Sequence, residues 1–213
     1  MSRVILFAVG FQLLLRAQQN FEGMIVYTTK IEGAMAEQLG EMLKSQVPEK
    51  IKVYYRGNKV RNEAGDAVVL IDGDAGTMYL LSTSLRTYRK APLTSPTEPD
   101  SGIKITKTKD KTQILKYPVQ KYLLEVPTVQ GKMKMEVWVT PELRVPQVAR
   151  QANNLTGGAR LEGVPLRSVT EIPGVDLRIV FLATQIDKTP PDESLFRIPS
   201  DYVEETGEII PKE

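Results

Sequence analysis

Residues 132–139, KMKMEVWV, alternate between two kinds of side chain more regularly than any other part of the chain. One set is apolar, and the other consists of two lysines, a glutamate and a tryptophan. Successive side chains of a β-strand point to opposite sides of a sheet, so this period of two predicts a strand with one buried face. That face carries Met133, Met135, Val137 and Val139.

Segments of similar composition recur on both sides of this stretch, separated by glycine, aspartate, asparagine and proline. Aromatic and β-branched residues favour strands, whereas the separating residues favour turns. The loop 72–76, DGDAG, predicts a hairpin, and its two aspartates fit a turn better than a calcium loop. The strands that we expect cover 21–30, 51–56, 59–63, 67–71, 77–82, 87–90, 103–110, 112–126, 132–139, 164–171 and 177–187.

Two proline-rich segments interrupt or follow these strands. Residues 91–102 contain three prolines and predict an irregular surface loop. The segment 190–202 is bounded by prolines, and we expect it to dock Leu195, Phe196 and Ile198 onto the core.

One segment, 34–46, has the periodicity of an amphipathic helix, and Pro48 ends it. Its apolar positions are spaced at i, i+4, i+7 and i+8, and they are Met35, Leu39, Met42 and Leu43. A second, shorter helix is expected over 146–153. The pattern as a whole predicts a mainly β (α+β) protein.

The first seventeen residues have the organisation of a secretory signal peptide. Arg3 precedes an apolar run over 4–15, and a polar stretch follows Ala17. This run is shorter than the roughly 20 apolar residues that a spanning helix needs. We therefore expect a signal peptide over 1–17, a single β domain over 18–213, no membrane span, and a periplasmic or secreted location in a bacterium.

The composition argues against several classes of function. The chain has 28 lysines and arginines against 26 aspartates and glutamates, and two of the arginines lie in the predicted signal peptide. A neutral domain offers no general electrostatic basis for nucleic-acid binding. The chain also has no histidine and no cysteine, which removes the commonest catalytic bases, thiol nucleophiles and zinc ligands. We expect a protein that is not an enzyme and has no cofactor or metal.

Two features admit more than one interpretation. The lysines of 104–116 fit a surface for lipid headgroups or nucleic acid, but also an exposed strand whose charges prevent pairing between sheet edges. The neutral net charge favours the second interpretation. The methionines fit an adaptable apolar pocket or an ordinary core.

Seven segments carry a resemblance through their order and spacing, and they are 21–27 (FEGMIVY), 52–61 (KVYYRGNKVR), 74–81 (DAGTMYLL), 87–88 (TY), 113–122 (QILKYPVQKY), 136–140 (EVWVT) and 194–199 (SLFRIP). Together they resemble a family of uncharacterised exported bacterial domains that is related in fold to the outer-membrane lipoprotein carrier. The chain departs from that family where Lys116-Tyr117 and Val119 replace a Gly-Tyr pair and a cysteine.

The resemblance implies a strongly curved antiparallel sheet that forms an unclosed barrel, with one or two helices covering its concave side. In the carrier relatives, that space accepts acyl chains of lipoproteins. We therefore expect a periplasmic carrier for an apolar ligand such as a lipid or an acylated protein. The expected lid and cavity residues are Met35, Leu39, Met42, Leu43, Met133 and Met135. The alternative is a non-catalytic envelope module with a filled core that binds a protein partner.

Overall fold

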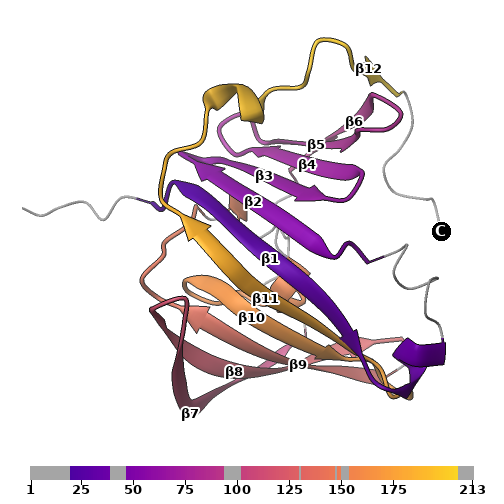
Figure 1. Cartoon of the computed structure of the whole chain (residues 1–213), viewed down its shortest axis with the longest axis vertical. Coiled ribbons are helices and arrows are strands. Elements are labelled where there is room, and N and C mark those ends of the chain that lie inside the picture. Colours follow the sequence, from indigo (N-terminus) through magenta and orange to yellow (C-terminus); the bar gives the residue numbers. More distant parts are fainter. Residues whose placement is uncertain are drawn as a thin grey trace, which may run out of the picture.

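The computed structural model describes residues 20–38, 47–93, 102–129, 131–146, 148–149 and 154–205. These residues include twelve strands, all in one sheet (Figure 1). The strands are β1 Gly23–Glu32, β2 Lys50–Arg56, β3 Lys59–Ala64, β4 Ala67–Asp72, β5 Thr77–Ser82, β6 Thr87–Pro92, β7 Lys104–Ile114, β8 Tyr117–Thr128, β9 Gly131–Thr140, β10 Val164–Glu171, β11 Arg178–Asp187 and β12 Val203–Glu204.

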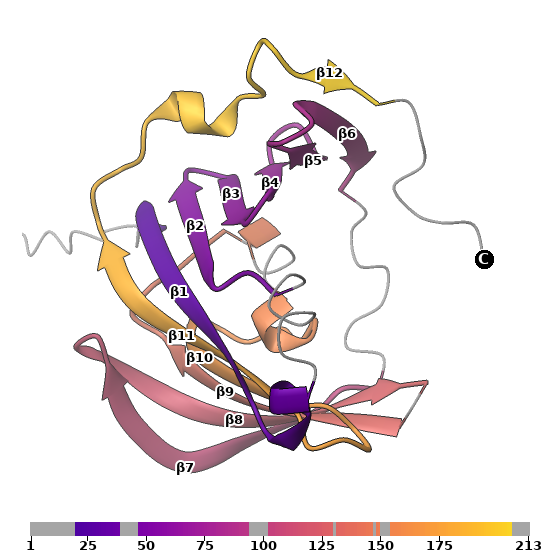
Figure 2. The same ribbon diagram turned by 45° about the vertical axis from the view of Figure 1, so that its right-hand side comes forward.

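The sheet curves strongly but does not close into a barrel (Figure 2). Its order is β12-β6-β5-β4-β3-β2-β1-β11-β10-β9-β8-β7, so β12 and β7 form its two edges. All neighbours are antiparallel except β12, which pairs parallel to β6. The prediction of a mainly β, antiparallel and unclosed sheet is confirmed.

The alternation in 132–139 is present in β9 as predicted. Met135, Val137 and Val139 are buried on one face, whereas Lys132 and Lys134 are exposed on the other. The predicted hairpin also forms, because β4 and β5 pair in register around the loop 73–76. The period of two was therefore sufficient to place β9, and the turn residues of 72–76 were sufficient to place the β4–β5 hairpin.

Two irregularities in strand pairing lie next to the centre of the sheet. The register between β1 and β11 shifts at Val26/Tyr27, and the register between β10 and β9 shifts between Pro165 and Arg167. Such bulges bend a strand and increase its twist, which a strongly curved sheet requires. The Tyr27 hydroxyl then donates a 2.9 Å hydrogen bond to the Pro165 carbonyl across the intervening strand β11.

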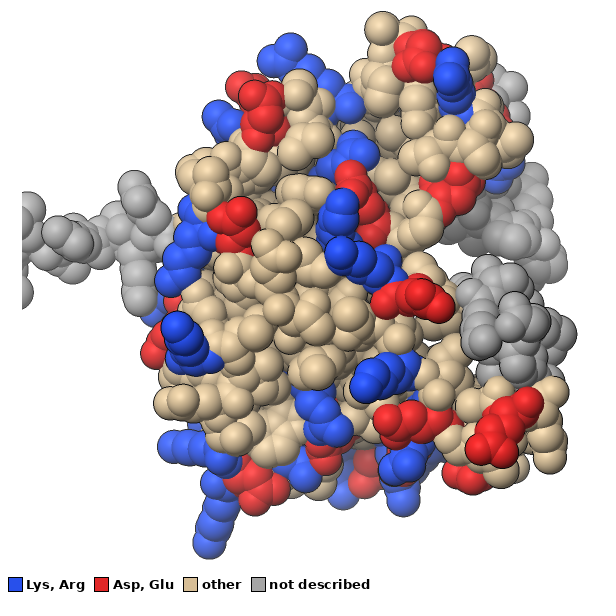
Figure 3. Space-filling model, viewed as in Figure 1, with Lys and Arg blue, Asp and Glu red and all other residues tan. Residues whose placement is uncertain are grey.

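The C-terminal segment 188–205 lies along the outer face of β3–β6 (Figure 2). Its Ile198 and Tyr202 pack against a buried cluster of Val68, Leu70 and Leu81. The expected docking is confirmed for Ile198, although its site is the outer face of the sheet and not the main core. Leu195 and Phe196, which were also expected to dock, are only half-buried. Figure 3 shows that the face seen in Figure 1 carries charges of both signs.

The predicted break between 103–110 and 112–126 was wrong. β7 continues to Ile114, and the chain turns at Leu115 and Lys116. Both turn residues have positive φ angles, 50° and 71°, in the left-handed region that glycine and asparagine adopt most readily. Because neither residue is a usual turn residue, the sequence carried no local signal for this turn.

The described helices are short. Residues 34–38 are helical, and the rest of the predicted helix 34–46 lies outside the described residues. The predicted helix 146–153 is described only at 146, 148 and 149, of which 148–149 are helical. Two 3₁₀ turns are present at Asn154–Thr156 and Glu193–Phe196. Helices that cover the concave side are therefore not confirmed.

The predicted signal peptide, 1–17, also lies outside the described residues. Among the residues that are described, no helix is long and apolar enough to cross a membrane.

Candidate functional site: the inner face of the sheet

The concave, inner face of the sheet holds most of the apolar core. Ile25 and Tyr27 of β1 lie next to Val53 and Tyr55 of β2, and all four are almost completely buried. A second cluster lies on the inner face of β8 and β9, where Leu124, Met135 and Val137 pack under Ala159 and Leu161. The segment that follows β9 therefore covers part of the inner face.

Other apolar side chains of the inner face retain solvent exposure. Leu80 of β5 lies opposite Val69 of β4, and 37% of Leu80 is exposed. Because Val69 packs against the main core, this pairing places Leu80 on the same face. The partly buried apolar residues that border the two inner clusters include Ile51, Val69, Met78, Leu93, Ile103, Ile105, Tyr122, Val126 and Met133.

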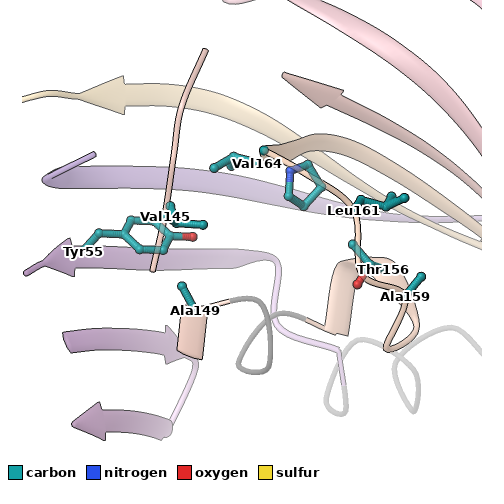
Figure 4. A pocket seen from close by; sticks show the side chains of 9 residues that line it. Tyr55, Val145, Ala149, Thr156, Ala159, Leu161 and Val164 are labelled. Atoms are coloured by element: carbon teal, nitrogen blue, oxygen red, sulfur yellow. The ribbon is translucent and has the colours of Figure 1, made fainter. Parts of the chain in front are cut away.

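A small apolar cavity lies between the inner face and the described residues of 145–163 (Figure 4). Its volume is about 20 Å³, which is room for about one water molecule. Gly163 borders it with φ near 104°, and a Cβ there would lie 2.0 Å from the Thr140 carbonyl oxygen. The other lining residues are Tyr55, Val145, Ala149, Thr156, Ala159, Leu161, Val164 and Pro165.

The structure places the predicted site residues unequally. Met133 and Met135 lie on the inner face as expected, with Met135 only 4% exposed. A Cβ on Gly157 would lie 2.7 Å from the Met135 sulfur, so this methionine is closely packed. Met35 is half-buried in the helix 34–38, where its amide donates to the Asp176 carbonyl. Leu39, Met42 and Leu43 lie outside the described residues.

Among the residues that the structure describes, three polar atoms on the inner face are buried without a hydrogen-bond partner, and none of the three was a predicted site residue. They are the hydroxyl oxygens of Thr29 and Ser168 and the amide oxygen of Asn62. Thr29 and Ser168 flank Phe181 on adjacent strands. Ser168 is two positions after the buried Leu166, so the available signal for its inward direction was the apolar side chain of Leu166. Such atoms are normally satisfied by a water or a ligand.

The outer face of β8–β10 carries an ion-pair network around Glu136. Its carboxylate accepts hydrogen bonds from Lys121 at 2.8 Å, from the Trp138 ring nitrogen at 2.7 Å, and from Arg167. Burial raises the pKa of Glu136, but the three donors outweigh this effect and hold the pKa below its usual value. Glu136 is therefore an ionised, paired carboxylate at neutral pH and not a proton donor.

A polar groove of about 550 Å³ lies at the β10–β11 turn, also outside the inner face. It combines Lys132, Lys134 and Arg178 with Glu171 and Asp176. Arg178 is already paired with Glu32, and Asp176 accepts a 2.9 Å hydrogen bond from the Ala34 amide, which begins the helix 34–38. Through these contacts, the residues of the groove hold the β10–β11 turn against the end of β1 and the start of the helix 34–38.

Within the described part of the chain, no group of three or more aspartates, glutamates, histidines or cysteines could hold a metal ion. The buried Tyr55 also offers no acid–base chemistry near neutral pH, because burial raises the pKa of its phenol.

Comparisons with known proteins give a likeness of fold only. No family model matches the chain, and no curated protein matches it. Two crystal structures of PNGF-II align with 87% of this chain at 15% and 18% identity and a TM-score of 0.49. The aligned part is 31% of the PNGF-II chain.

An uncharacterised conserved protein from Thermus thermophilus aligns over 85% of this chain and 90% of its own, at 12% identity and a TM-score of 0.49. These likenesses concern the β-rich fold alone. None of the three structures carries the name of the lipoprotein-carrier family, so that resemblance stays a prediction.

Proposed function

We propose that the protein is an exported, non-catalytic carrier that binds an apolar ligand, such as a lipid or an acylated protein, on the inner face of its sheet. The supporting observation is that inner-face apolar side chains beyond the packed core remain partly exposed. Leu80, with 37% of its surface exposed, is the clearest of them. Covering apolar surface gains about 25 cal/mol for each Å² removed from water, so a hydrocarbon chain is the matching ligand.

The ligand would lie along the wall formed by Val69, Met78 and Leu80 on β4 and β5. These three side chains share one face, since Leu80 is paired with Val69 and Met78 with Ile71 of the core. The small cavity at Gly163 is not the ligand site that we propose, because pockets for organic ligands have volumes of roughly 300–1,000 Å³. Its volume of about 20 Å³ is far smaller.

The test is binding of a fluorescent acyl probe, cis-parinaric acid, to the full chain and two variants. Leu80→Glu places a charge on the proposed wall, and we expect it to weaken probe binding at least about tenfold. Leu85→Glu is the matched control, because Leu85 is 69% exposed in the β5–β6 turn. Native mass spectrometry of protein recovered from expressing cells should also detect co-purified lipid.

A protein that carries no lipid and binds no acyl probe would contradict the proposal. If Leu80→Glu and Leu85→Glu lost probe binding equally, the wall of Val69, Met78 and Leu80 would not be the binding site.

The second candidate is an envelope module that binds a protein partner. One observation favours it: β7 is an edge strand of eleven residues that has no strand neighbour beyond it among the described residues. Strand addition to such an edge is a common mode of peptide recognition. A pull-down from envelope extract that captures one protein in a stable ratio, without lipid in either partner, would favour this candidate over the carrier.

A further inference from the structure

The edge strand β7 and the turn after it, residues 104–116, form what we call the β7 rim. Its five lysines are all exposed, and its single acidic residue is Asp110. Blue side chains project from the lower left of the molecule in Figure 3, where β7 lies in Figure 1. The rim lysines are Lys104, Lys107, Lys109, Lys111 and Lys116.

Among the described residues, most of this positive charge has no acidic partner. Lys104 pairs with Glu125 at 3.4 Å, and Asp110 pairs with Lys121 of β8 at 3.5 Å. Across the described residues, no ion pair joins Lys107, Lys109, Lys111 or Lys116 to an acidic side chain. The rim therefore presents four unpaired cations along one strand and its turn.

The turn that ends the rim has a second unusual property. Leu115 is 38% exposed, and its φ of 50° is a strained backbone conformation for a leucine. Lys116 follows with φ of 71°, and the next ring, Tyr117, lies 5.2 Å from the Lys188 ammonium. An exposed aliphatic side chain thus stands at the tip of the hairpin, next to Lys116 in the sequence and two residues before Tyr117.

From these two features together we propose that the β7 rim docks the protein on an anionic lipid membrane. The four unpaired lysines would lie against the lipid phosphates, and Leu115 would enter the apolar boundary below the headgroups. Lysines near an anionic bilayer and an exposed apolar side chain are the two contributions that hold proteins at such surfaces. This inference does not depend on the carrier function, because a partner-binding module could dock in the same way.

Protection of the sheet edge explains the lysines of β7, but it does not explain the exposed Leu115 at the tip of the hairpin. Charges on an edge strand prevent pairing with other strands, whatever lies at its end. That role gives no reason for a leucine in a left-handed turn, where asparagine or glycine would be less strained. Nucleic acid would use the cations but has no apolar layer for Leu115, so the lipid surface accounts for more of the observations.

The experiment is co-sedimentation of the full chain with vesicles. One set contains phosphatidylglycerol and phosphatidylcholine, and the other contains phosphatidylcholine alone. We expect binding to the anionic vesicles only, and a steep loss of binding as salt is raised, because the Debye length falls from about 10 Å at 0.1 M to about 3 Å at 1 M. All variants retain the apolar stretch 4–15, so differences between them report on the rim.

The charge variant replaces Lys107, Lys109 and Lys111 with glutamate, and we expect it to lower vesicle binding by about a hundredfold or more. Its matched control makes the same change at three exposed lysines of other strands that have no ion pair with a described residue, and it should bind nearly as well as the original chain. The control positions are Lys30, Lys50 and Lys134.

The variant Leu115→Asn separates docking from folding. Asparagine suits the left-handed turn, so the thermal midpoint should stay the same or rise. Vesicle binding should nevertheless fall several-fold, because the apolar contact is lost. A purely structural leucine would not give these opposite changes.

Three results would overturn the proposal. They are equal binding to neutral and anionic vesicles, an equal loss of binding in the control triple variant, and undiminished binding by both rim variants. Retention of the protein by a DNA duplex with no binding to vesicles would also overturn it, and would assign the rim to nucleic acid.

Discussion

At the scale of single residues, Tyr27 joins two strands that are not neighbours. Its hydroxyl, in a completely buried side chain, donates to the Pro165 carbonyl of β10 across β11. Tyr27→Phe would leave that carbonyl without its donor, at a cost of about 1–2 kcal/mol in the free energy of unfolding. Urea denaturation measures this loss. Tyr54→Phe is the control, because Tyr54 is only partly buried and its hydrogen bond to Glu63 is 3.5 Å long.

Glu136 sets a dependence of stability on pH. Because the pKa of Glu136 is lower in the folded chain, its contribution is fully present above its usual value, about 4.5, and is lost as the pH falls through the lowered folded value. We expect Glu136→Gln to lower the free energy of unfolding by about 1 kcal/mol at pH 7. The variant and the original chain should then converge in acid, as denaturation from pH 7 to 3 would show.

Glu32→Gln is the control for this prediction, since the pair of Glu32 with Arg178 is long, 3.7 Å, and about half exposed. A pH-independent difference between Glu136→Gln and the original chain would contradict the assignment.

At the scale of elements, the C-terminal segment 188–205 is held by one small apolar contact and by hydrogen bonds and ion pairs with β2, β3 and β6. Ile198 and Tyr202 supply its apolar anchors, and the Leu195 carbonyl accepts a 3.0 Å hydrogen bond from Arg61 of β3. The double variant Ile198→Ala and Tyr202→Ala should release the segment while the sheet stays folded. Limited proteolysis with mass spectrometry should show cleavage within 188–205 about tenfold faster or more.

Val203→Ala is the control for the segment, because Val203 is 68% exposed. Unfolding of the whole chain in the double variant would show instead that the segment is needed for the sheet itself.

The elements also differ in how far local sequence could predict them. The prediction of a strand over 132–139 was correct because the alternation of its side chains reports directly which of them are buried. The Leu115–Lys116 turn was missed because its residues have no turn preference, and pairing between β7 and β8 imposes the conformation. The inner position of Met133 and Met135 was predictable from periodicity, but the close contact of Met135 with Gly157 was not.

At the scale of the whole molecule, an unclosed sheet has two edges, and unprotected edges pair with other chains. Replacing Lys107, Lys109 and Lys111 with threonine removes charge from β7 but keeps its strand preference. We expect concentration-dependent association, measured by light scattering. The same change at Lys30, Lys50 and Lys134, which are on inner strands of the sheet, should leave the chain monodisperse.

Glutamate at the three β7 positions keeps the edge charged, so the vesicle experiment and this one test different properties of the same strand. If the threonine variant does not associate, the lysines are not needed to protect the edge.

The sequence by itself determined the β class, most strand boundaries and which face of β9 is buried, because these depend on side-chain order over a few residues. Only the tertiary structure decided the sheet order, the position of β7 at its edge and the place of the C-terminal segment on the outer face. It also placed Thr29 of β1 next to Phe181 of β11, which is paired with Ser168 of β10 on its other side, although β1 is far from both strands in the sequence. Pairing between distant strands depends on packing of the whole sheet, and no local pattern records it.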